Sequence, residues 1–206
     1  VQAERAAGRN VVGFMLTGTT ATNPTVSFSS KEGANPPQLR VVHTPTPTGF
    51  QQTAGGLLSM EAENYNALTS GSGTFAGWDW TQQSDATASG GSFVSVPDGT
   101  TPSLNNSATS LTASRLDYTA NFHATGTHYV WLRMKSQTID FTSDSVWVSL
   151  DGSAYTQGVW NGSAWTWVKL PTSFNIATTG SKTLSLLMRE NGQMIDKIVV
   201  TTDNNY

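Results

Sequence analysis

Two glutamates, Glu61 and Glu63, are spaced so that they could act together. They lie two residues apart in Met60-Glu61-Ala62-Glu63-Asn64-Tyr65, so a β-strand would place both carboxylates on one side. Like charges this close repel each other unless a cation lies between them. Calcium takes roughly six to eight hard oxygen ligands, so a further acid is needed. Asp196, in the last apolar run of the chain, is well placed to supply it.

The same pair has a second chemical interpretation. Glycoside hydrolases use two carboxylates roughly 5 to 9.5 Å apart, and side chains two residues apart on a strand fall near that range. Catalytic carboxylates normally flank a substrate from opposite sides of a cleft, whereas Glu61 and Glu63 would project together from one strand. The pattern therefore favours a metal site over a catalytic one. Two solvated glutamates on an edge strand are the remaining alternative.

Aromatic residues form the second group that could carry a function, since the chain contains seven tryptophans. Sugars present apolar C–H faces on which exposed aromatic rings stack, while nearby polar groups bind the hydroxyls. The candidates in expected loops are Trp78, Trp80, Tyr155, Trp160 and Trp165. Loop packing is an equally good interpretation of Trp78 and Trp80. Trp131 and Trp147 fall within expected strands and are interpreted as structural.

Composition excludes several classes of partner. Charged residues form 12% of the chain and the net charge is -3, which argues against binding of nucleic-acid phosphates. There is no Cys, so disulfides and thiolate chemistry are excluded. No apolar run approaches the roughly 20 residues of a membrane span, so membrane insertion is not expected. Residues 1–20 lack the regions of a signal peptide, and the N-terminus is interpreted as a cut into a longer extracellular chain.

Short strands must position these residues. Apolar or alternating runs separated by Gly, Ser, Asn and Asp predict eight strands, at residues 57–63, 93–96, 114–118, 128–135, 145–150, 165–170, 182–188 and 194–201. With no long helical period, this pattern predicts an all-β fold, an antiparallel β-sandwich of the jelly-roll type, over residues 57–206. In the fourth run, Val130, Leu132 and Met134 share one face, which is expected to form the core.

The N-terminal part is expected to be separate. Residues 1–43 contain three strand-like runs, too few for a core of their own, and residues 44–56 read as a linker that begins with alternating Pro and Thr. The segment Phe28-Ser29-Ser30-Lys31-Glu32-Gly33-Ala34-Asn35-Pro36-Pro37-Gln38-Leu39 resembles the closing strands of the DNRLRE-type β domain. The resemblance implies a truncated β segment. Because three strands rarely make a core, this segment must pair with missing sequence, pack on the larger domain or complete itself by pairing with a neighbouring molecule.

The larger part resembles carbohydrate-binding modules of families 6 and 35. The resemblance rests on Glu-Ala-Glu at 61–63, Ile195-Asp196, Gly90-Gly91-Ser92-Phe93-Val94, residues 126–133 and Leu150-Asp151-Gly152. It implies a structural calcium site made by Glu61, Glu63 and Asp196 with backbone carbonyls. It also implies that, in Gly162-Ser163-Ala164-Trp165-Thr166-Trp167, Trp165 is the sugar-stacking platform and Trp167 packs inward.

One position departs from that pattern. These modules carry an Asn before the Ile-Asp pair, and its amide binds a sugar hydroxyl, whereas this chain has Met194. The preceding loop offers polar substitutes, and Glu190, Asn191 and Gln193 are the candidates.

The leading hypothesis is a non-catalytic, calcium-stabilised module that tethers a larger secreted or cell-surface protein, bacterial or archaeal, to a polysaccharide. Its other partners would be further modules of the same parent chain. The first alternative is a structural or adhesive surface module of the same fold without a working sugar site. The second is a piece of a glycan-degrading enzyme whose active site lies in a part of that enzyme outside this sequence.

Overall fold

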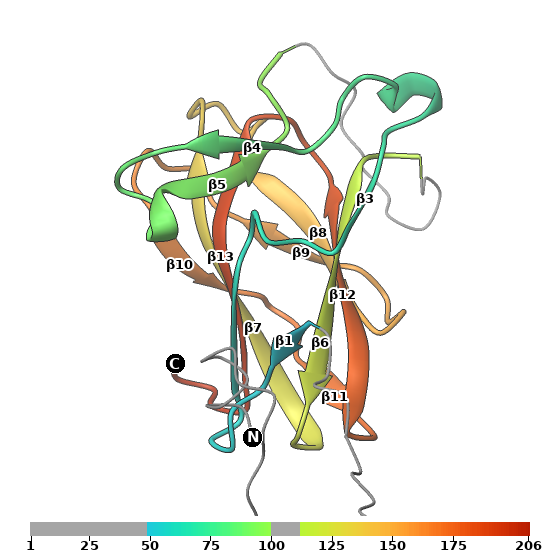
Figure 1. Ribbon diagram of the computed structural model, residues 1–206. Helices are drawn as coiled ribbons and strands as arrows, with labels where there is room; N and C mark the ends of the chain where they lie inside the picture. The colour runs from blue at the N-terminus through green and yellow to red at the C-terminus, as the bar shows by residue number, and fades with distance from the viewer. Residues whose placement is uncertain (1–48, 100–111) are drawn as a thin grey trace, which may run out of the picture. The chain divides into compact units, whose positions relative to one another are not determined.

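The computed structural model describes residues 49–99 and 112–206, and its described part is an antiparallel β-sandwich (Figure 1). One sheet has six strands in the order β1-β6-β12-β8-β9, with β3 also pairing with β6. Its strands are β1 (Phe50–Gln51), β3 (Ala67–Thr69), β6 (Arg115–Phe122), β8 (Ser145–Leu150), β9 (Thr156–Val159) and β12 (Gly180–Met188). The short β1 pairs with β6 in parallel, and the other pairs of this sheet are antiparallel.

The second sheet has seven strands in the order β10-β7-β13-β5-β4, with β11 pairing with β7 and β2 with β13. Its strands are β2 (Leu57–Glu61), β4 (Thr81–Ser84), β5 (Ser92–Ser95), β7 (Gly126–Ser136), β10 (Thr166–Lys169), β11 (Phe174–Ile176) and β13 (Gln193–Thr201). Two short 3₁₀ turns, η1 (Gly73–Phe75) and η2 (Ser89–Gly91), lie in connections. The prediction of an all-β sandwich is confirmed.

The core lies between the two sheets and follows the alternation of their strands. Val130, Leu132 and Met134 of β7 are fully buried, as predicted. They belong to the same cluster as Leu184 and Leu186 of β12, on the opposite sheet. Each such side chain stabilises the fold by about 1.5–3 kcal/mol when removed from water, so the inward face of each central strand is fixed. The intervening residues of β7 face outward.

The first strand in sequence of the seven-stranded sheet, β2, and the last, β13, are neighbours: they pair antiparallel, and Glu61 lies opposite Lys197. The pairing of β13 with β7 shifts between Ile195 and Lys197. This β-bulge leaves Asp196 as the extra residue. Bulges redirect side chains and are common beside functional sites, and here the carboxylate of Asp196 is brought next to the loop that precedes β5.

All eight predicted strands are present, and β8 has the predicted bounds. Five further strands (β1, β3, β4, β9 and β11) were not predicted. Residues 1–43, with the predicted DNRLRE-type strands and self-assembly, lie outside the described residues, as do residues 44–48 of the predicted linker. The rest of that linker, residues 49–56, is described and contains β1. Among the described residues, no helix is long and apolar enough to span a membrane.

Candidate functional site

The three predicted metal ligands lie around the η2 turn, on the seven-stranded sheet. Glu61 ends β2, Glu63 follows it in a turn, and Asp196 is the bulged residue of β13. The hydroxyl of Ser89 donates to Glu61 Oε1 (3.0 Å), and the backbone N–H of Ser89 donates to Asp196 Oδ1 (2.9 Å). One residue of η2 therefore holds two of the three carboxylates.

Two cations neutralise two of these three acids, Glu61 and Asp196. Lys197 Nζ donates to Glu61 Oε1 at 2.6 Å. Arg133 Nη1 is paired with Asp196 Oδ2, and its Nη2 donates to the carbonyl of Thr87 (3.2 Å). Asp196 is fully buried, so its ion pair is poorly screened by water, whereas Glu61 and Lys197 are about a quarter exposed. Neither cation was predicted as a partner.

Two carboxylate oxygens of this cluster have no partner, Glu61 Oε2 and Glu63 Oε2, and both are buried. Burial raises the pKa of Glu63 above its ordinary value, and the charges of Glu61 and Asp196 raise it further. The pKa of Asp196 is also raised by burial, although Arg133 opposes the shift. Within the described ranges, no three His, Cys, Asp or Glu side chains are close enough together to hold a metal ion.

Trp165 and Trp167 share the outer face of the seven-stranded sheet, because they are two residues apart, Trp165 directly before β10 and Trp167 within it. The Trp165 ring meets Phe93 edge-on at 5.5 Å, and Arg133 and Lys135 lie over it at 5.5 and 5.4 Å from its centroid. Its buried indole N–H has no hydrogen-bond partner. Trp165 is thus a partly covered ring between two cations.

Trp167 was predicted to pack inward, and this is wrong: it is 38% exposed. Its ring meets Tyr206, itself 47% exposed, edge-on at 6.0 Å. Tyr206 also lies 6.2 Å from Trp131, and the indole N–H of Trp131 is buried without a partner. We call these four rings, Trp131, Trp165, Trp167 and Tyr206, the aromatic face.

A cavity of about 480 Å³ opens on the aromatic face beside Trp167 and Tyr206. Leu57 and Ser59 of β2 line it from one side, and the stretch from Thr87 to Ser89 lines it from another. Arg133 and Lys197 lie in its wall. The cavity thus joins exposed aromatic rings to hydroxyl and cationic donors, and it lies next to the carboxylate cluster.

The other predicted tryptophans pack against the protein. Trp80 is 2% exposed, and its indole donates to the carbonyl of Ser114 (3.0 Å). No ring face is left for a ligand, which corrects the prediction for this residue. Trp78 and Trp160 are partly buried against the core. The Trp160 ring covers Gly162, where an added Cβ would lie 2.9 Å from it, and its indole donates to the carbonyl of Ala164 (3.3 Å).

The three predicted polar ligands, Glu190, Asn191 and Gln193, are buried and hydrogen-bonded within the protein. Glu190 accepts from the Asp144 N–H (3.1 Å), the Ser145 hydroxyl (2.5 Å) and Arg189. Asn191 donates to Asp98 (3.1 Å) and the Gly99 carbonyl (2.6 Å). Gln193 donates to the carbonyls of Lys135 (3.0 Å) and Met194 (3.2 Å). Glu190 and Asn191 connect loops, Gln193 connects β13 to β7, and this structure does not bring the three to the aromatic face.

Fold and site together define a β-sandwich module with an open aromatic surface. Residues 49–205 match the family described as "Glycosyl hydrolase family 115 C-terminal domain". The chain belongs to this family. No curated protein matches it.

Solved structures of similar fold include modules and larger enzymes. The C-terminal CBM6 of LamC, a laminarinase from Zobellia galactanivorans, is 19% identical with a TM-score of 0.47, and the match covers 71% of this chain and 99% of that one. CBM6cm-2 of Cellvibrio mixtus lichenase 5A, in complex with cellotriose, is 15% identical with a TM-score of 0.49, and the match covers 71% of this chain and 97% of that one. The Podospora anserina GH26-CBM35 β-(1,4)-mannanase is 16% identical with a TM-score of 0.48, and the match covers 71% of this chain and 28% of that one. The chain therefore spans about a quarter of the length of that mannanase.

Proposed function

We propose that the domain formed by residues 49–206 binds a polysaccharide on its aromatic face. The observation that carries the proposal is the exposed Trp167 ring at the wall of a cavity of about 480 Å³. Sugar-binding sites need an apolar ring for the C–H face of the sugar and polar groups for its hydroxyls. Ser59 and Lys197 supply such groups beside Trp167.

The charges of this face point to a neutral or weakly charged polymer. Lys197 is paired with Glu61, Arg133 with Asp196 and Lys135 with Asp85. These three cations are already compensated, whereas Lys169, which lies over the Trp131 ring (5.8 Å), donates to the carbonyl of Asn204 (2.9 Å). One such charge does not give this face a concentrated positive field for a strongly anionic chain. The unpartnered indole N–H groups of Trp131 and Trp165 are two further donors that small side-chain movements would make available to hydroxyl oxygens.

In this proposal the domain performs no chemistry and delivers a larger, secreted glycoside hydrolase to its substrate. Membership of a family of hydrolase C-terminal domains supports this role. The state of Glu61 and Glu63 supports it as well, since Glu61 is held by Lys197 and Ser89 and both glutamates lie beside one turn rather than across a cleft. Catalysis and the parent's substrate would then belong to other parts of that protein.

Calcium remains part of the proposal as a structural ion held by Glu61, Glu63 and Asp196. Two buried carboxylate oxygens without partners, on Glu61 and Glu63, are the hard donors that calcium prefers. Binding would require Glu61 to exchange Lys197 for the ion and the three carboxylates to move closer together. Bound calcium would supply charge compensation only.

The calcium proposal is tested by melting the protein with and without a chelator. Wild type and the exposed control Asp203→Asn should melt lower after chelation, whereas Glu63→Gln should be insensitive. If chelation leaves the wild-type melting temperature unchanged, Lys197 and Arg133 are the only counter-charges and the metal site is withdrawn.

Sugar binding is tested by affinity gel electrophoresis over a panel of plant and algal polysaccharides. Wild type and Val159→Ala, which removes an exposed side chain from the other sheet, should be retarded by at least one neutral polymer. Trp167→Ala should lose about 1 kcal/mol of stacking, or about fivefold in affinity. If no polymer retards the wild type, the structural or adhesive alternative replaces this proposal.

A further inference from the structure

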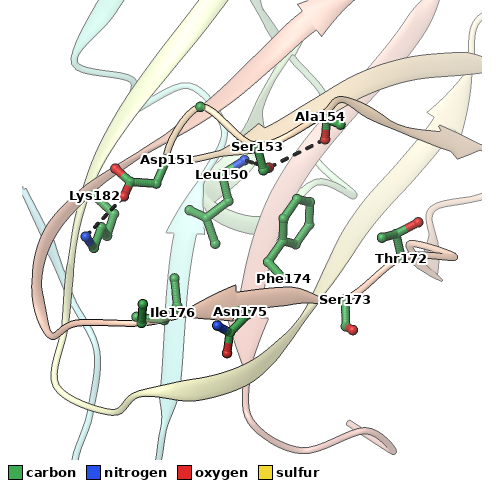
Figure 2. A pocket seen from close by; sticks show the side chains of 12 residues that line it. Leu150, Asp151, Ser153, Ala154, Thr172, Ser173, Phe174, Asn175, Ile176 and Lys182 are labelled. Atoms are coloured by element: carbon green, nitrogen blue, oxygen red, sulfur yellow. Dashed lines mark hydrogen bonds and ion pairs between the residues drawn. The ribbon is translucent and has the colours of Figure 1, made fainter.

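A second cavity lies on another side of the sandwich, between the β8–β9 turn and β11. Its volume is about 430 Å³, within the range of roughly 300–1,000 Å³ typical of small-molecule sites. Figure 2 shows its centre, where the Phe174 ring and the Leu150 side chain lie side by side, with Ile176 on the same strand as Phe174. We call it the hairpin cavity. None of its lining residues belongs to the aromatic face or to the carboxylate cluster.

The rim of the hairpin cavity is polar and fixed by a tight turn. Asp151 and Gly152 have φ values of +53° and +75°, and the Ser153 N–H donates to the Leu150 carbonyl (3.1 Å). Positive φ at both central residues is typical of a type I′ turn, which Asp-Gly adopts readily. The turn is anchored to β12 by the Asp151 N–H, which donates to the Thr183 carbonyl (2.7 Å). The turn therefore fixes the backbone from which the Asp151 side chain projects.

An ion pair sits at one edge of this rim, where Lys182 Nζ lies 3.0 Å from Asp151 Oδ2 (Figure 2). An anionic ligand would meet the carboxylate and a cationic one the ammonium, whereas a neutral ligand can accept from Lys182 and donate to Asp151. The Ser153 hydroxyl, which accepts from the Leu150 N–H (3.1 Å) and donates to the Ala154 carbonyl (3.5 Å), is a third polar group among the lining residues (Figure 2). An apolar floor with a polar rim of no net charge suits a neutral polyhydroxylated ring.

We infer that the hairpin cavity is a second ligand site, which takes one neutral sugar ring such as a chain end or a side branch. This goes beyond the proposed function and does not require the aromatic face to bind. Where both sites hold one polymer, the second contact would raise overall avidity without any new contact at the first site. The two sites lie on different strands, so each can be disabled alone.

The test is a ¹H–¹⁵N titration of the whole chain with D-xylose, L-arabinose, D-galactose and D-glucose, and with D-glucuronate and D-glucosamine as charged controls. At least one neutral sugar should shift the amide signals of residues 150–154 and 172–177 in a saturable way. Ala154→Trp, which fills the mouth from an exposed position, should abolish these shifts, while the matched control Ala76→Trp should retain them. Both variants are first checked for wild-type melting temperature and signal dispersion.

A second variant keeps the inference falsifiable if Ala154→Trp perturbs the fold. Asp151→Asn tolerates the same positive φ but frees Lys182, so D-glucuronate should now shift these signals where it does not in wild type. Trp167→Ala should leave all of these shifts unchanged, which separates this site from the aromatic face. The inference is overturned if no neutral sugar gives saturable shifts at residues 150–154 and 172–177, or if charged and neutral sugars shift them equally.

Discussion

Replacing Arg133 with Met should expose how strongly the buried Asp196 carboxylate depends on its counter-charge. Asp196 is fully buried, and its charged partner in the structure is Arg133. Removing one partner of a buried ion pair leaves an uncompensated charge and costs about 3–5 kcal/mol. At about 2–4 °C per kcal/mol for a chain of this size, Arg133→Met should lower the melting temperature by roughly 6–20 °C.

The matched control is Lys197→Met, because Lys197 forms the neighbouring ion pair with Glu61. Both of those side chains are about a quarter exposed, so water screens the pair and its loss should cost about 1 kcal/mol or less. Both variants replace a long cation by a long apolar chain on the same face of the same sheet. The difference between them therefore reports the burial of the acid.

The pH dependence of Arg133→Met distinguishes lost charge compensation from lost packing. Burial already raises the pKa of Asp196, and Arg133 opposes this shift, so the variant should have a higher Asp196 pKa still. A carboxyl group whose folded pKa is raised binds its proton more tightly in the folded state, so the stability deficit should shrink as pH falls through that pKa. Thermal melts between pH 4 and 8 measure this. Equal, pH-independent losses in Arg133→Met and Lys197→Met would refute the reasoning.

Two further predictions concern the core residue Trp80 and the loop that contains Asp140 and Asp144. Trp80→Phe should lower the free energy of unfolding by about 1–3 kcal/mol in chemical denaturation, because the Ser114 carbonyl loses its indole donor. Polysaccharide binding should not change. A loss of binding without unfolding would return Trp80 to the ligand site. Burial and the nearby Glu190 raise the pKa of Asp144. The protonated carboxyl therefore favours the folded state, and this contribution to stability is lost as pH rises through that pKa. Asp144→Asn should melt above wild type at pH 7 but not at pH 4. Asp140→Asn is the control of opposite sign, because hydrogen bonds from Thr142 lower the pKa of Asp140. This variant should melt below wild type at pH 7. A higher melting temperature in both variants would contradict the raised pKa of Asp144.

The strands that the sequence predicted are those with a continuous apolar side. β8 and the inward face of β7 were predicted because their apolar residues leave no other face for the core. β4, Thr81–Ser84, contains only polar residues, and β9 contains Gly158, whose missing Cβ makes room for Leu132 and Leu170. Such edge strands are formed by pairing with a neighbour, which no local pattern records.

The candidate site was predicted in part for the same reason. The pairing of β2 with β13 brings Glu61 and Asp196 to one region. Sequence reasoning anticipated this, because it took these runs as the first and last strands of the sandwich. It did not anticipate Arg133 and Lys197, because the partner of a charge depends on register across strands. The exposure of Trp167 could have been predicted: Thr166, Val168 and Leu170 alternate with the two tryptophans, and Leu170 is buried, so Trp165 and Trp167 share the outward face.

The central claim is that polysaccharide binds on the aromatic face, and hydrogen exchange measured by mass spectrometry tests it most directly. The measurement compares the whole chain alone with the chain saturated by the polymer that retards it most in the gel. The proposal predicts slower exchange in peptides that contain β10, the part of β7 that carries Trp131 and Arg133, and the residues around Tyr206. Protection confined to the loops around residues 137–144 and 189–192, with none over β10, would contradict it.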